Sequence, residues 1–295
     1  MFARIHIILL SILSIEGAGQ EVCKLIPASF NSEYDEYCAQ DFDIGFAFCS
    51  NRRIDFFKQS LDGDYNPNSN ILYIRGKIKE TSELAEVLNS VENEGPFSFS
   101  PDQTRIYFTG TVLSTRKNVG NWLGIYYSDY KNAVWGKPVS LPINSDDGTF
   151  HVAHPGISSD GKTLFFSSDM QGGFGGKDIY AYEIKEDDIS VPYNLGASVN
   201  SDQDEITPFM GRGNLLYFST NSTENLDFDI FCVNYSKSDI GQKNRLPEPI
   251  NSEYDDLAFW LDETSKIGTL SSFRNGLNCD VFLLSDFISG IYSPK

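Results

Sequence analysis

Short apolar segments alternate with polar turns along most of the chain. The apolar segment Pro96–Phe99 is followed by the polar turn Ser100–Gln103 and by a second apolar segment, Arg105–Phe108. Proline presets the first dihedral angle of such a turn, and aspartate tolerates the rest. A third apolar segment, Gly124–Tyr127, and a more polar one, Trp135–Val139, complete the unit. Short runs bounded by turn residues are typical of strands, so the pattern predicts four antiparallel strands.

The same order of segments recurs further along the chain. Second strands are expected at Thr163–Ser168 and Leu215–Ser219, and third strands at Asp178–Tyr182, Asp229–Val233 and Asp280–Leu284. The fourth strand of each unit is expected at a sheet edge, where proline is tolerated because no ladder hydrogen bond is lost.

A short phrase, Asn-Ser followed by acidic residues, marks the start of each unit. Its five copies begin at Asn31, Asn89, Asn144, Asn200 and Asn251, with spacings of 58, 55, 56 and 51 residues. Five near-equal repeats of four strands each are the signature of a β-propeller. We therefore predict an all-β fold, a five-bladed β-propeller with four antiparallel strands per blade.

The first and last segments are expected to meet and close the ring. The fifth repeat has three clear strands and ends near Leu284, whereas residues 21–29 precede the first phrase in the register of a fourth strand. Pairing of residues 21–29 with Asp280–Leu284 would remove an open sheet edge. The ring is thus predicted to be closed by an N-terminal strand.

The first nineteen residues are typical of a signal peptide. Arg4 precedes the apolar run Ile5–Ile15, and the small residues Gly17–Gly19 provide a cleavage point. No later segment is long and apolar enough to predict a membrane span. We expect residues 1–19 to direct export and residues 20–295 to form a single propeller domain.

The charge of the chain restricts its partners. There are 41 acidic and 23 basic residues, which give a formal net charge of −18. Such a surface repels the phosphates of nucleic acids and anionic lipids, so neither is expected as a partner.

One stretch of the third repeat resembles a known family. Residues Pro155–Asp169 resemble the WD40-like repeat of TolB-type propellers, and residues Gln171–Tyr180 are similar to the version found in cell-envelope proteins of Bacteroidota. In that group an OmpA-like domain often follows the propeller, and this chain ends at Lys295 without one. The resemblance implies a periplasmic or outer-membrane-associated scaffold that binds other envelope proteins.

Catalytic chemistry has little support in the sequence. His151 and His154 are the only histidines outside the predicted signal peptide, and their spacing points them to opposite faces of a strand. A metal site would need further ligands from other blades. We therefore expect a non-enzymatic protein with no cofactor and no metal ion. Calcium binding by a loop near Asp62–Asp64 is an alternative, although Pro67 occupies the position where such a loop has glycine.

The acidic residues of the phrases suggest an alternative function, the binding or hydrolysis of carbohydrate. Glu36, Glu94, Asp147, Glu205 and Asp256 lie near the predicted starts of the inner strands. A suitable carboxylate pair at the channel mouth could bind or hydrolyse carbohydrate. Repetition in every blade instead favours a structural role, in which each acid binds the backbone of its own loop.

Two cysteines flank the first predicted hairpin turn. Cys38 and Cys49 lie on either side of the turn at Asp43–Gly45, so they are expected to be neighbours and could form a disulfide.

One face of the predicted propeller carries the longest loops. The connections from second to third strands emerge on the same side as the phrases, and function concentrates on long loops held by a rigid scaffold. Aromatic and arginine side chains anchor protein interfaces. The predicted contact residues, inside a polar rim of phrase acids, are Arg116, Lys117, Trp122, Phe174, Lys177, Phe273 and Arg274.

Overall fold

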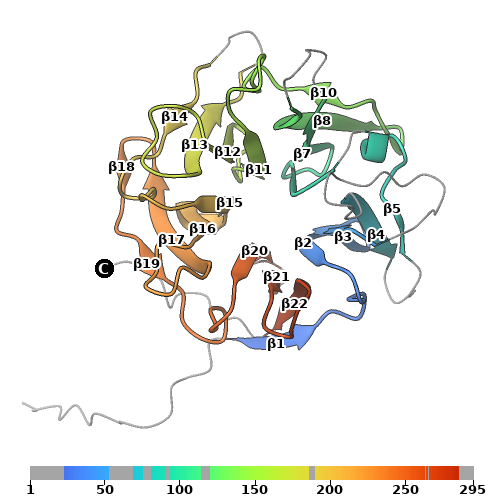
Figure 1. Ribbon diagram of the computed structural model, residues 1–295. Helices are drawn as coiled ribbons and strands as arrows, with labels where there is room; N and C mark the ends of the chain where they lie inside the picture. Colours follow the sequence, from blue (N-terminus) through green and yellow to red (C-terminus); the bar gives the residue numbers. More distant parts are fainter. Residues whose placement is uncertain are drawn as a thin grey trace, which may run out of the picture.

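The computed structural model shows five antiparallel sheets arranged as blades around a central axis (Figure 1). The all-β, five-bladed propeller predicted from the repeats is confirmed. The structure describes residues 23–52, 69–75, 81–90, 93–113, 120–185, 190–262, 264 and 266–285. The predicted signal peptide, the calcium loop near Asp62–Asp64 and two predicted contact residues, Arg116 and Lys117, lie outside these residues.

Each blade is a meander whose first strand lies next to the axis. Blade 1 comprises β2 (Glu36–Phe42), β3 (Gly45–Ser50), β4 (Asn70–Arg75) and β5 (Thr81–Glu83). Blade 2 follows the short helix η1 (Leu88–Ser90) and comprises β6 (Phe97–Phe99), β7 (Arg105–Val112), β8 (Trp122–Lys131), β9 (Val134–Trp135) and β10 (Val139–Ser140). Blade 3 comprises β11 (Val152–Ile157), β12 (Thr163–Ser168), β13 (Asp178–Glu183) and β14 (Tyr193–Asn194).

The remaining blades complete the circle. Blade 4 comprises β15 (Glu205–Met210), the helical turn η2 (Arg212–Asn214), β16 (Leu215–Thr220), β17 (Asp229–Ser236), β18 (Asp239–Ile240) and β19 (Asn244–Arg245). Blade 5 comprises β20 (Asp256–Asp262), β21 (Ile267–Ser272), β22 (Asp280–Ser285) and, from the other end of the chain, β1 (Lys24–Pro27).

The N-terminal strand closes the ring as predicted. β1 pairs with β22 in antiparallel register, with Lys24 opposite Ser285 and Pro27 opposite Phe282. Figure 1 shows β1 as the outermost strand of the last blade. The pairing covers the edge of β22, which would otherwise present unpaired backbone groups.

The outer strand of blade 2 differs from the prediction. The expected strand Trp135–Val139 is replaced by two short strands, β9 and β10, which both pair with β8. Pro138 lies between them and has no N–H to donate to a ladder, so the strand is interrupted there. Blade 4 shows the same division, since β18 and β19 both pair with β17.

The hydrophobic core is divided among the blade interfaces. Five clusters of buried apolar side chains occur, and each is centred between two neighbouring blades. Phe48, Phe108, Phe165 and Phe218, on the second strands of blades 1 to 4, are among the largest fully buried side chains. Because every blade is buried on both faces, the second and third strands are nearly continuous apolar runs.

Candidate functional site

Two faces of the propeller are distinguished by their connections. The loop face carries the phrases and the loops from second to third strands, and the turn face carries the turns from first to second strands, such as residues 43–44 and 158–161. Both faces open into the central channel.

The asparagine of every phrase clamps the third strand of the preceding blade. Its side-chain oxygen accepts a hydrogen bond from one backbone N–H, and its nitrogen donates to the carbonyl of the same residue, over 2.7–3.2 Å. The five pairs are Asn31 with Val281, Asn89 with Ile71, Asn144 with Ile125, Asn200 with Ile179 and Asn251 with Ile230. The repeated asparagine therefore serves the fold.

The acids at the starts of three inner strands fold back onto their own phrases. Glu36 accepts hydrogen bonds from the backbone N–H and the hydroxyl of Ser32, four residues earlier. The phrases of blades 4 and 5 repeat this arrangement with Glu205 and Asp256. All three carboxylates are fully buried. They cannot form the exposed polar rim that the sequence suggested, because they satisfy backbone donors inside the loops.

The other two phrase acids behave differently. Glu94 is also buried, so it is not part of a rim. Asp147 is exposed and accepts hydrogen bonds from Ser145 and Thr149 within its own turn. In blade 3, the position that corresponds to Glu36 is occupied by Val152, whose side chain has no polar group.

Two predicted contact residues have side chains that are buried or paired within the protein. The side chain of Trp122 is buried against Gly148, and its indole N–H donates to the carbonyl of Ser145 over 3.0 Å. Arg274 forms a buried ion pair with Asp256 and donates to two carbonyls of the preceding loop. Neither offers a free side chain for a partner. Sequence alone could not separate these roles, because both partners come from outside the loop concerned.

The remaining described contact residues lie nearer the surface. Lys177 pairs with Asp204 over 3.3 Å, and Phe273 is half-buried. Phe174 is 51% exposed at the tip of the β12–β13 loop. Among the predicted contact residues that the structure describes, Phe174 is therefore the one best placed to contact a partner.

Phe174 is one of four exposed apolar residues in the loops between second and third strands. Leu113, Leu226 and Leu277 are exposed in the same loop, between second and third strands, of blades 2, 4 and 5. Leu277 is 97% exposed. We call these four residues the apolar tips. The three leucines are not among the predicted contact residues, because the prediction was limited to aromatic and basic side chains.

The apolar tips lie among exposed acids. The phrases and loops of this face expose the side chains of Glu33, Asp146, Asp169, Asp202, Glu224 and Glu253. The cations that the structure describes in the same loops, Arg52, Lys177 and Arg274, are each paired with an acid. The described part of the loop face is therefore both apolar and negatively charged.

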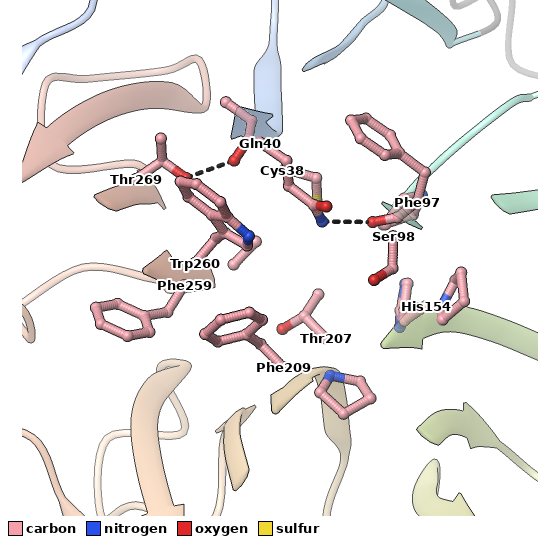
Figure 2. A pocket seen from close by; sticks show the side chains of 15 residues that line it. Cys38, Gln40, Phe97, Ser98, His154, Thr207, Phe209, Phe259, Trp260 and Thr269 are labelled. Carbon is pink, nitrogen blue, oxygen red and sulfur yellow. Dashed lines mark hydrogen bonds between the residues drawn. The ribbon is translucent and has the colours of Figure 1, made fainter. Parts of the chain in front are cut away.

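The central channel has a waist between two chambers. The waist is a cavity of only about 30 Å³, lined by inner-strand residues of all five blades. Figure 2 shows Phe209 and Trp260 on one side of it and Ser98 and His154 on another. On the loop face the channel widens into a mostly apolar chamber of about 360 Å³. On the turn face it widens into a more polar chamber of about 420 Å³.

His154 and Cys38 are the ionisable residues in the described lining of the waist. The Nδ1 of His154 lies 2.8 Å from the hydroxyl of Ser167, and burial lowers the pKa of the imidazole to about 4, with the charge of Lys177 contributing in the same direction. The imidazole is therefore neutral at pH 7. No carboxylate of the described residues is hydrogen-bonded to Ser167 or His154, so the pair lacks the third member of a catalytic triad.

The five cysteines are buried, and none of them forms a disulfide. The disulfide considered between Cys38 and Cys49 is absent, because a β-bulge in β2 places Tyr37 opposite Cys49 and displaces Cys38. Cys38 instead faces the channel, where burial raises the pKa of its thiol. A protonated thiol is a poor nucleophile.

The residues that the structure describes contain no helix long and apolar enough to cross a membrane. They also contain no group of three or more His, Cys, Asp or Glu side chains that could hold a metal ion.

Comparison with known proteins relates the chain to propellers at low identity. No family model and no curated protein matches it. TolB from Acinetobacter baumannii is 16% identical, with a TM-score of 0.46 over 77% of this chain and 48% of that chain. The β-propeller domain of the Trilobed protease from Pyrococcus furiosus is 12% identical, with a TM-score of 0.42 over 86% and 96%.

One enzyme has a similar sequence identity and TM-score. An α-L-arabinofuranosidase from Clostridium thermocellum is 15% identical, with a TM-score of 0.48 over 85% of this chain and 88% of that chain. The chain spans less than half the length of the first three solved structures that it matches. These similarities concern the propeller fold alone.

Proposed function

We propose that this chain is an exported, non-catalytic binding protein of the bacterial cell envelope, which holds a protein partner on its loop face. The observation that carries the proposal is the set of apolar tips, which repeats one exposed apolar side chain at the same loop in four successive blades. Single exposed apolar residues are ordinary, but several gathered on one face are typical of interaction sites.

The surroundings of the tips suggest the chemistry of the partner. Exposed acids lie in the same loops and phrases, and the described cations there are neutralised by ion pairs. A partner with basic residues around an apolar patch would match this face in both respects. Such complementarity accelerates encounter and disfavours acidic competitors. The apolar chamber of about 360 Å³ at the centre of the face could accept one of its side chains.

The positions of the phrase acids argue against glycoside hydrolysis on this face. A glycosidase needs two carboxylates that reach the substrate, one as acid and one as base or nucleophile. Glu36 and Asp256 are instead paired with Arg52 and Arg274, and Glu205 is bound by Ser201 and Thr220. These contacts support the structural role that repetition suggested, and they favour binding over catalysis.

The test is capture of an envelope partner by the purified mature chain. We expect that changing Phe174, Leu226 and Leu277 together to serine abolishes capture of a specific protein, because the apolar contact is lost. The matched control changes Ile44 and Ile267, two exposed apolar residues of the turn face, to serine. Equal capture by both variants, with unchanged melting temperatures, would show that the loop face is not the interface.

A further inference from the structure

The chamber on the loop face has apolar walls and a more polar floor. Its volume is about 360 Å³, at the small end of the range of ligand pockets, and its walls include Leu123, Ile206 and Leu257. The residues that line both this chamber and the waist form its floor (Figure 2): Cys38, Pro96, His154, Thr207 and Ala258. An occupant that enters from the loop face therefore needs an apolar stem, because only its tip reaches the floor.

The polar side chains of the lining are mostly bonded within the protein. The Tyr37 hydroxyl donates to the Ser69 hydroxyl over 2.6 Å, and the side-chain oxygen of Asn93 accepts a hydrogen bond from the Ser69 N–H. On the floor, the Thr207 hydroxyl donates to the carbonyl of Leu257 over 2.8 Å. These groups have hydrogen-bond partners without any ligand.

His154 on the floor is different, because only one of its ring nitrogens is used. Its Nδ1 lies 2.8 Å from the Ser167 hydroxyl, which is also 3.3 Å from the carbonyl of Ala153. Both contacts are satisfied when Nδ1 carries the proton and the Ser167 hydroxyl donates to Ala153. None of the described residues is hydrogen-bonded to Nε2, which is then an acceptor without a donor at the end of an apolar chamber.

The scaffold does not require this second nitrogen. Thr207 holds the matching position of blade 4, at the same bulge and with a similar φ of 49° against 56° for His154. Its hydroxyl lies 2.7 Å from that of Ser219, just as Nδ1 of His154 contacts Ser167. One polar atom is therefore enough at this position of a blade, and Nε2 of His154 is available to an occupant of the chamber.

We propose that the loop-face chamber binds the phenol ring of a tyrosine that the protein partner presents. The inference rests on the function proposed above, since it names the residue that enters the loop face. The ring packs against Leu123, Ile206 and Leu257, and the hydroxyl at its tip donates to Nε2 of His154.

The chemistry of the chamber selects tyrosine among the side chains that carry a hydroxyl. Tyrosine places its hydroxyl at the far end of a rigid apolar ring, whereas serine and threonine carry theirs on the first side-chain carbon, too short to span the apolar walls. The exposed acids of the loop face favour basic residues on either side of this tyrosine.

The experiment compares two peptides by isothermal titration calorimetry with the full mature chain. One has a single tyrosine between two lysines on each side, and the other has phenylalanine in its place. Both carry the same charge, so the difference between them measures the hydroxyl alone. We expect the tyrosine peptide to bind about threefold to tenfold more tightly, as for one hydrogen bond. The measurement uses no envelope partner, so its failure is separate from a failure of capture.

Variants locate the two halves of the contact. His154→Asn keeps a residue that tolerates the left-handed conformation but lacks Nε2, so it should bind both peptides equally, within about twofold. Leu257→Trp fills the chamber and should weaken both peptides about tenfold or more. The control is Ile267→Trp, at an exposed residue of the turn face, which should change binding less than about twofold. If Leu257→Trp fails to fold, Leu123→Trp at another wall serves instead.

Three results would overturn the assignment. Equal binding of the two peptides to the wild-type chain would show a chamber that accepts any apolar ring. A preference for tyrosine that persists in His154→Asn would place the hydroxyl at another group. Binding of p-cresol as tightly as the tyrosine peptide would make a free phenol the ligand, rather than a residue of the partner.

Discussion

His154 shows how single residues shape the channel wall. It adopts a left-handed backbone conformation, with φ of 56°, at a bulge of the inner strand. Cys38 and Thr207 do the same at the matching positions of blades 1 and 4. Such a conformation costs about 1 kcal/mol or more for a residue with a side chain. It is held by the neighbouring blade, since the His154 N–H donates to the Thr109 hydroxyl over 2.9 Å.

The neutral state of His154 predicts a pH dependence of stability. Its pKa is about 4 in the folded chain, against 6.5 when exposed, so the unfolded chain binds the extra proton first. The stabilisation is complete above pH 6.5 and is lost progressively as the pH falls towards 4. We expect wild type to lose up to about 3 kcal/mol relative to His154→Asn over this range.

Urea unfolding of both proteins at a series of pH values measures this difference. Asparagine is a suitable replacement because it tolerates the left-handed conformation. A difference between the two proteins that stays constant from pH 7.5 to 4 would contradict the assignment of a buried neutral imidazole.

At the scale of elements, the asparagine clamp replaces part of an outer strand. The side chain of Asn200 bonds both backbone groups of Ile179 in β13, over 2.7 and 3.0 Å, where β14 is only two residues long. The clamp thus completes the hydrogen bonding of the third strand near its start. It also ties the phrase of one blade to the strand of the blade before it.

Replacing Asn200 by alanine should therefore be costly. The change leaves the buried N–H of Ile179 without its partner, whereas the Ile179 carbonyl keeps the hydrogen bond that the Leu195 N–H donates to it. An unsatisfied buried donor costs about 1–3 kcal/mol, so we expect a decrease of that size in the free energy of unfolding. The control is Asn275→Ala, at an exposed asparagine of the β21–β22 loop, which should leave the unfolding midpoint unchanged.

For the whole molecule, closure of the ring joins the two ends of the chain. Asn31 binds Val281, β1 pairs with β22, and Asp35 accepts a hydrogen bond from the Cys279 N–H. Ala28 and Phe30 share a buried cluster with Val281. Blades 1 and 5 therefore share a buried cluster, the pairing of β1 with β22 and the asparagine clamp at Val281.

Removal of residues 1–27 should expose the edge of β22 and loosen this junction. We expect the melting temperature to fall by roughly 10 °C, corresponding to several kcal/mol, and the truncated protein to aggregate through the open edge. Removal of residues 1–19 alone, the predicted signal peptide, is the control and should leave the melting temperature unchanged. Equal melting temperatures for both truncations would mean that β1 does not stabilise the ring.

The number of blades, the order of the strands and the closure by residues 21–29 could be predicted from the amino-acid sequence. These features depend on local chemistry: turn residues such as Gly161, runs of alternating or continuous apolar residues, and a phrase repeated at nearly constant spacing. Local preferences act over a few residues, so they can be recognised without the rest of the molecule.

The side chains that are available to a partner could be identified only in the folded protein. Arg274 was expected at the surface, but its charge is taken up by Asp256 at the start of an inner strand. Trp122 is likewise buried by a glycine of the next phrase. Asp41 and Asp262 come together because the ring joins blades 1 and 5, which lie at opposite ends of the sequence. The pairing and exposure of a side chain depend on neighbours from distant parts of the sequence, so they cannot be predicted from the local sequence.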